Sequence, residues 1–302
     1  MRDAAWRWAI ERALHVARAA LAQAPTPARI RTVFKLAAPL AARREIFDVS
    51  APIAVGDAQG WWVRPGGIPP GSVILYFHGG GFVSNARELY DPFLATLARA
   101  AGARGFMLDY RLAPEHPFPA ALADCFAAWH FVLSSGIDPG RIVIGGDSAG
   151  GNLALVTAMR ARDEGIPQPA GLVLISPVLD MTFSGPSLER NDGIDPMFRA
   201  SSARALSAYY GAGVDPRDPR LSPLLGRLSG LPPTMLLVGS SELLLDDTLR
   251  FAARVPGSKA SVWHDMPHVF PAIRGLAAGD RAIREMGEFI RERTAAATAG
   301  AA

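Results

Sequence analysis

The chain has 302 residues, 49% of them apolar, and a formal net charge of only +3 at pH 7. This length and apolar content suffice for an α/β domain with an appended cap. Basic residues are scattered among acidic ones, which argues against a nucleic-acid surface. The single cysteine, Cys125, excludes an internal disulfide and Cys/His zinc motifs, and we expect it to be buried in an apolar helix.

The N-terminal region predicts helices. Apolar residues recur at helical spacing over 4–24, and a second helical stretch continues to about residue 43. Charged residues interrupt every candidate signal-peptide core, and no apolar run approaches the ~20 residues of a membrane span. We therefore expect a cytoplasmic protein without stable membrane insertion. A membrane-surface helix is the alternative, which the interleaved acidic residues disfavour.

From residue 45 the pattern changes to strands, first at 44–49 and 53–63, and then at 72–77, an apolar run typical of a parallel strand buried on both faces. Strands and helices then alternate, which predicts an α/β fold with a mostly parallel eight-stranded sheet and helices on both faces. The later strands are expected at 103–108, 141–145, 171–176, 234–239 and 259–264, and the helices at 86–101, 119–134, 149–163, 242–254 and 270–293. Beyond residue 293 the periodicity ends, which predicts a frayed tail.

The interval 177–233 interrupts this alternation and is too long for an ordinary connection. It contains one helical piece at 196–210. We predict that 1–44 and 177–215 fold together as a helical cap on a domain spanning 45–302. The cap would cover the carboxyl edge of the sheet, where ligands bind in open α/β folds. The large side chains of these blocks are candidate pocket walls or ordinary cap core: Trp6, Trp8, Phe34, Met197, Phe198, Tyr209 and Tyr210.

The segment Gly146-Asp147-Ser148-Ala149-Gly150 lies between a predicted strand and a predicted helix. In this G-x-S-x-G pattern, small neighbours allow the serine a strained turn that exposes its hydroxyl at the carboxyl edge of the sheet. The pattern also occurs by chance, so a flexible loop is the alternative. The nucleophile interpretation therefore depends on whether the chain supplies the other parts of such a site.

A second candidate follows strand 72–77, at His78-Gly79-Gly80-Gly81-Phe82. Glycines at a strand end allow backbone N–H groups to face a ligand, so Gly80 and Gly81, together with Ala149, are candidates for an oxyanion hole. Each such donor commonly stabilises a transition state by ~2.7–4 kcal/mol. A phosphate loop is the alternative, but neither G-x-x-x-x-G-K-[ST] nor G-x-G-x-x-G fits. We interpret His78 as a structural residue that orients the loop.

A serine nucleophile needs a base, and only two histidines follow Ser148. His264 lies within or at the end of strand 259–264, where the sheet would fix it. His268 lies beyond that strand, in a loop that can reach Ser148. The sequence therefore favours His268, and we interpret His264 as an edge-strand or surface residue.

The base in turn needs an acid, which is expected after strand 234–239. Glu242 is the first acidic residue beyond that strand. Asp246 follows four residues later on the same face of the predicted helix and is the alternative. Asp247 is expected to point elsewhere, as a solvated helix residue. The sequence favours Glu242.

These motifs together resemble the hormone-sensitive-lipase group of α/β-hydrolases, also called the bacterial family IV esterases. The resemblance rests on four segments in order: His78–Gly81, Asp109–Ala120, Gly146–Gly150 and Pro267–Phe270. It implies a capped α/β-hydrolase that hydrolyses acyl esters without a metal or an organic cofactor. The family usually has D-x-L-x-D at its acid, whereas this chain has Glu242, Leu244 and Asp246. Members often dimerise through the last strand, here 259–264.

The resulting hypothesis is a carboxylesterase acting on short- to medium-chain acyl esters, with Ser148, His268 and Glu242 as a triad and an acyl-enzyme intermediate. An amidase or deacetylase with the same triad is the first alternative. A non-catalytic receptor for a small ligand on this fold is the second, and the presence of both Ser148 and His268 disfavours it.

Overall fold

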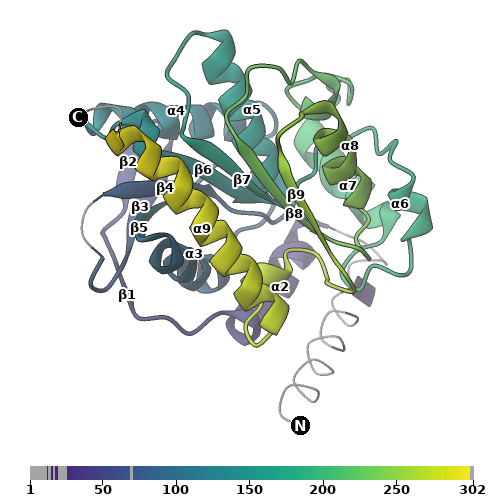
Figure 1. The fold of residues 1–302 in the computed structure, drawn as a ribbon. Helices are drawn as coiled ribbons and strands as arrows, with labels where there is room; N and C mark the ends of the chain where they lie inside the picture. Colours follow the sequence, from purple (N-terminus) through teal and green to yellow (C-terminus); the bar gives the residue numbers. More distant parts are fainter. Residues whose placement is uncertain (1–11, 13–14, 16–17, 20–25, 69–70, 300–302) are drawn as a thin grey trace.

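The computed structural model describes residues 12, 15, 18, 19, 26–68 and 71–299. The helix predicted over 4–24 therefore lies almost wholly outside the described residues, as do Trp6 and Trp8. Figure 1 shows a central twisted sheet with helices on both of its faces. None of the described helices is both long enough and apolar enough to cross a membrane.

Within the described residues the sheet contains eight strands in the order β1-β3-β5-β4-β6-β7-β8-β9, and the short strand β2 pairs with β3 as a ninth. The strands from β4 to β9 run parallel, and β1, β2 and β3 form antiparallel pairs. The predicted strands are confirmed except that the single strand predicted over 53–63 is divided into the antiparallel pair β2 and β3. The strands are β1 Phe47–Val49, β2 Ile53–Val55, β3 Ala58–Pro65, β4 Ser72–Phe77, β5 Ala103–Asp109, β6 Ile142–Asp147, β7 Gly171–Ile175, β8 Thr234–Gly239 and β9 Lys259–Trp263.

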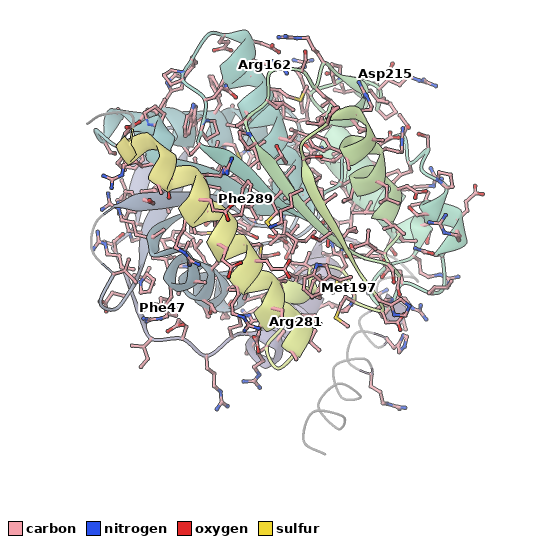
Figure 2. All side chains as sticks on the ribbon, viewed as in Figure 1. Phe47, Arg162, Met197, Asp215, Arg281 and Phe289 are labelled. Atoms are coloured by element: carbon pink, nitrogen blue, oxygen red, sulfur yellow. The ribbon has the colours of Figure 1, made fainter. Side chains whose placement is uncertain are left out.

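Two apolar cores lie on opposite faces of the sheet. Successive side chains of a strand alternate between faces, so Leu75 packs with α4 and α5, whereas Tyr76 packs with α3 and α9. Phe289, labelled in Figure 2, is part of the contribution of α9 to the second core. The helices are α2 Pro27–Ala41, α3 Arg87–Ala101, α4 Ala120–Ser134, α5 Ala149–Asp163, α6 Ser187–Arg190, α7 Ala200–Gly211, α8 Leu245–Arg254 and α9 Ala277–Ala299, with short 3-10 turns η1 Pro139–Arg141, η2 Pro223–Leu225 and η3 Phe270–Ala272.

The C-terminal end differs from the sequence prediction. The predicted helix 270–293 is divided into η3 and α9, and α9 continues to Ala299, so the expectation of a frayed tail is wrong for residues 294–299, whereas residues 300–302 lie outside the described residues. Alanine has the highest helix propensity, and extending an existing helix requires no new nucleus. The Ala-rich end therefore continues the helix although the amphipathic periodicity of the sequence ends before it.

Helix α2 is fastened at both of its ends to loops that follow sheet strands. Near its start, Arg31 Nε donates to Val83 O at 2.8 Å, and the guanidinium pairs with Glu115 at 2.6 Å. Just beyond its end, Arg43 Nε donates to Pro271 O at 2.8 Å and Arg43 Nη1 pairs with Asp280 at 2.7 Å. The helix therefore lies against the loops after β4 and β9.

The segment around α7 reaches the same edge of the sheet. Tyr210 stacks on Phe82, the residue after the three glycines, with ring centroids 3.9 Å apart. The Tyr210 carbonyl also accepts a hydrogen bond from Phe118 N at 2.9 Å. Two segments far apart in the sequence, α2 and α7, thus lie against the loops at the carboxyl ends of the parallel strands.

Candidate active site

Ser148 occupies a sharp turn between β6 and α5. Its φ of 52° and ψ of −116° lie in a region that side chains rarely adopt, as the sequence predicts for a strained turn. The turn depends on close backbone packing, because a Cβ atom on Gly146 would overlap the carbonyl of Gly150, and one on Gly150 would overlap that of Phe77. The N–H of Ser148 donates to Ile175 O at 2.8 Å, which joins the turn to β7.

The glycine loop after β4 lies beside this turn. Gly80 and Gly81 have φ values of 113° and 63°, which favour glycine over residues with a side chain. In the described part of the chain, the amides of Gly80, Gly81 and Ala149 have no hydrogen-bond acceptor. All three residues line the same cavity as Ser148, so their N–H groups are available to a ligand there.

Asp147, whose importance the sequence did not indicate, joins the glycine loop to the serine turn. Its carboxylate accepts hydrogen bonds from Gly79 N at 3.0 Å and from the hydroxyls of Tyr76 and Tyr90, both at 2.9 Å. Burial raises the pKa of Asp147 to about 6, although these hydrogen bonds oppose the rise. A buried carboxylate with three donors rigidly connects β6 to the loop after β4.

The segment 109–120, for which the residues alone suggest no chemistry, supports the glycine loop from outside. Tyr110 donates its hydroxyl proton to His78 O at 2.7 Å, and Ala113 N donates to Phe82 O at 2.9 Å. The ring of Tyr110 also stacks on that of His78, with centroids 4.2 Å apart. The segment therefore holds both ends of the loop.

His78 itself is fully buried, and its Nδ1 lies 2.7 Å from Gly79 O, which requires Nδ1 to be the donor. Burial lowers the pKa of His78, so the ring is neutral near pH 7. These contacts agree with the prediction that His78 orients the loop.

Glu242 and His268 meet at the carboxyl ends of β8 and β9. His268 Nδ1 lies 2.7 Å from Glu242 Oε2, and since a carboxylate only accepts, Nδ1 is the donor. The other carboxylate oxygen, Oε1, accepts from Gly239 N at 2.5 Å and from Ser176 Oγ at 2.8 Å. Glu242 is completely buried and His268 is 3% exposed. In the neutral form of the imidazole, this hydrogen bond places the proton on Nδ1 and leaves Nε2 able to accept one.

The carboxylates around His268 decide the direction of its pKa shift. Burial alone would lower the pKa of His268, but these carboxylates together outweigh burial and raise the pKa, Glu242 contributing most through its charge and its hydrogen bond. The carboxylates of Asp195 and Asp147 act in the same direction. The rings of Phe198 and His268 pack edge to face, with centroids 5.2 Å apart.

The other acid candidates lie elsewhere. Asp246 Oδ2 accepts from Ser187 N at 2.6 Å, so this carboxylate faces α6 and not His268. Asp247 is not solvated, contrary to the sequence prediction, because it is 5% exposed and accepts from Leu179 N at 2.6 Å and Asp180 N at 3.1 Å. Residues 179–180, distant in sequence, cover it.

His264 lies at the surface, as the sequence predicts. Its side chain is 88% exposed and its Nδ1 lies 2.9 Å from a carboxylate oxygen of the neighbouring Asp265. Cys125 is buried and free, also as predicted. Among the described residues no group of three His, Cys, Asp or Glu side chains is placed to hold a metal ion.

A cavity of about 360 Å³ opens above Ser148 and His268. Its walls are almost entirely apolar and come from α2, α7 and the loops after β4, β8 and β9. Of the predicted pocket walls, Phe34, Met197 and Phe198 line it, whereas Tyr209 and Tyr210 do not. Met197, labelled in Figure 2, lies beyond the ends of β8 and β9. The described cavity walls carry no lysine or arginine.

Comparisons with known proteins agree with this architecture. A family described by its α/β-hydrolase fold matches residues 74–272. An acetyl-hydrolase of Streptomyces hygroscopicus is 38% identical, covering 80% of this chain and 82% of the relative. Esterase LipU of Mycobacterium tuberculosis is 34% identical, covering 82% of this chain and 88% of the relative. The crystal structure of an esterase from the bacterial hormone-sensitive lipase family superposes with a TM-score of 0.87 at 36% identity, covering 94% of this chain and 97% of that one.

The chain belongs to the α/β-hydrolase family. Within it, the chain is a member of the hormone-sensitive-lipase group of esterases, in agreement with the four sequence segments that suggest this group.

The buried carboxyl group of Asp247 is expected to make the stability of the protein depend on pH. Burial and the nearby charge of Asp180 raise the pKa of Asp247 from 3.8 to about 7, although the amide of Leu179 opposes the rise. The stabilising contribution of this group is therefore complete below about pH 4 and is lost as the pH rises through about 7. Asp247→Asn cannot ionise and keeps an acceptor oxygen. It is expected to raise the free energy of unfolding more at pH 8 than at pH 5, with each pKa unit worth roughly 1.4 kcal/mol.

Urea unfolding of both proteins at the two pH values measures this difference. Asp48→Asn, at an exposed position of β1, is the control and is expected to change little at either pH. An equal effect of Asp247→Asn at both pH values would contradict the prediction.

Proposed function

We propose that this chain is a serine carboxylic ester hydrolase in which Ser148 is the nucleophile, His268 the general base and Glu242 the acid that orients the base. The hydrogen bond between His268 Nδ1 and Glu242 Oε2, at the floor of a cavity that also contains Ser148, carries the proposal. In this arrangement the chain order is serine, acid, histidine, as in other α/β-hydrolases.

The first half of the reaction forms an acyl-enzyme. His268 Nε2 takes the proton of Ser148 while Oγ attacks the ester carbonyl. The developing oxyanion accepts hydrogen bonds from the unpaired amides of Gly80, Gly81 and Ala149, which are already oriented before the reaction. His268 then donates its proton to the departing alcohol. Glu242 stabilises the imidazolium throughout and does not itself take the proton.

The second half repeats the chemistry with water as the nucleophile. His268 removes a proton from water, the hydroxide attacks the acyl carbonyl, and Ser148 leaves as an alkoxide that regains the proton from His268. Because the cavity walls are apolar and lack a cationic side chain, we propose uncharged acyl esters of short to medium length as substrates. We also propose that α2 and the segment 177–215 form the cap that shields this reaction from bulk water.

Ser148→Ala is expected to reduce turnover of p-nitrophenyl butyrate by roughly 10⁴-fold or more, because the nucleophilic oxygen is absent. The thermal unfolding midpoint, measured in parallel, is expected to stay near that of the wild type. Labelling with phenylmethylsulfonyl fluoride, followed by mass spectrometry, is expected to modify Ser148 in the wild type and not in the variant. Retained turnover in the variant would exclude Ser148 as the nucleophile.

Glu242→Gln and Asp246→Asn form a matched pair that tests the acid. The glutamine variant is expected to lose roughly 10³- to 10⁴-fold in kcat, since an amide does not stabilise the imidazolium and favours the wrong tautomer. The acidic limb of its residual kcat/KM profile is expected at lower pH, because the charge that raises the pKa of His268 is gone. Asp246→Asn is expected to change neither quantity. The reverse pattern would assign the acid to Asp246.

We further propose a homodimer through β9. This strand is at the edge of the sheet in the described chain, and Val262 in it is 47% exposed. An edge strand with unpaired backbone groups is a ready site for pairing with a second copy.

Light scattering after size-exclusion chromatography is expected to give the dimer mass for the wild type and the monomer mass for Val262→Lys, which places like charges at the interface. Val49→Lys, on β1 at the opposite edge, is the control and is expected to leave the dimer intact. A monomeric wild type at micromolar concentrations would reject the dimer.

A further inference from the structure

Ser176, the residue that follows β7, makes three contacts at the back of the candidate site. Its hydroxyl lies 2.8 Å from Glu242 Oε1, and the same oxygen lies 3.1 Å from the amide nitrogen of Val269. Its own amide donates to Leu237 O at 2.7 Å. The side chain is completely buried, and φ is 47°. Both the amide and the hydroxyl of Ser176 are hydrogen-bonded, and its backbone is in the left-handed region. The side chain therefore has little freedom to change rotamer.

The directions of these hydrogen bonds follow from the donors available. A hydroxyl has one proton, and an ionised carboxylate can only accept, so Ser176 Oγ donates to Glu242. The N–H of Val269 can only donate, so it uses a lone pair of the same oxygen. One hydroxyl therefore connects the carboxylate after β8 with the residue that directly follows His268 after β9.

We propose that Ser176 is a positioning residue that fixes the Glu242 carboxylate and the His268 loop relative to each other. This inference rests on the proposed function of the triad. Glutamate has one more rotatable bond than the aspartate common in this family, so its carboxylate needs more restraint to keep one oxygen on the base. Ser176 and Gly239 N together hold Oε1, which leaves Oε2 facing His268 Nδ1.

Ser187 supplies a matched comparison within the same region. It is also a buried serine, and its hydroxyl donates to Leu243 O at 2.7 Å and accepts from Asp246 N at 3.0 Å. Both hydroxyls thus make two hydrogen bonds, that of Ser187 to Leu243 and Asp246 and that of Ser176 to Glu242 and Val269. Of the two, only Ser176 contacts Glu242 or the His268 loop. Ser187→Ala therefore measures how the loss of a buried hydroxyl affects stability without affecting these contacts.

The experiment compares Ser176→Ala and Ser187→Ala in the wild-type chain and in Glu242→Gln, using p-nitrophenyl butyrate. Ser176→Ala is expected to lower kcat by about 10- to 100-fold with KM within about twofold, because a hydrogen bond to a charged group is lost while substrate contacts remain. Ser187→Ala is expected to lower the thermal unfolding midpoint and leave kcat within about twofold. In the Glu242→Gln background, Ser176→Ala is expected to have no further effect on kcat, because it acts through that carboxylate.

Two results would overturn the inference while leaving the proposed function in place: equal kcat values for the two serine variants, or the same loss from Ser176→Ala in both backgrounds. Full activity of Glu242→Gln would overturn both, since the acid would then lie elsewhere. Ser176→Cys keeps a donor at this position, although the thiol is a weaker donor and slightly larger than the hydroxyl. It is expected to fold like the wild type and to lose kcat to a smaller degree, and wild-type kcat in this variant would count against the inference.

Discussion

The close approach of helix α5 to strand β4 constrains the rest of the site. Gly150 allows the first turn of α5 to lie against the carbonyl groups of Phe77 and His78, and any side chain there would separate them. The serine turn and the glycine loop are therefore in direct contact through backbone atoms. Asp147 strengthens it with a hydrogen bond from Gly79. As a result, backbone packing fixes the Ser148 hydroxyl relative to the amides opposite it. Their relative position does not depend on the conformation of a long, flexible side chain.

The second half of the site is assembled differently, from side chains at the ends of three neighbouring parallel strands. Glu242 follows β8, His268 follows β9 and Ser176 follows β7, so the sheet order places all three at one edge. Asp195 connects this half to the segment before α7, because its carboxylate accepts from the amides of Leu243, Met197 and Phe198. The buried carboxylate of Asp195 thus joins the wall of the cavity to the segment that carries Glu242. Burial raises the pKa of Asp195.

Sequence periodicity predicts the strands and most helices because each buries an apolar face, and the glycine spacing indicates Ser148 and the loop after β4. Local pattern does not separate Glu242 from Asp246, for a physical reason. The helix predicted from residue 242 would place Glu242 and Asp246 on one face, but α8 begins at Leu245, so that spacing does not apply and Asp246 turns toward α6. Asp247 is covered by residues 179–180, and Ser176 meets Glu242 across 66 positions of sequence. Such contacts depend on how distant loops pack, which local patterns do not encode.

The two arginines that fasten α2 use main-chain carbonyl groups as acceptors. Arg31 binds the carbonyls of Val83 and Ala113, and Arg43 binds that of Pro271. Every sequence supplies such carbonyls, so this part of the attachment of α2 does not depend on which side chains the neighbouring loops carry, whereas the ion pairs with Glu115 and Asp280 do. The residues of α2 that face the cavity, such as Phe34 and Ala37, are therefore free to vary without loosening the helix. Related enzymes can in this way evolve cavities of different size and shape around an unchanged set of reacting groups.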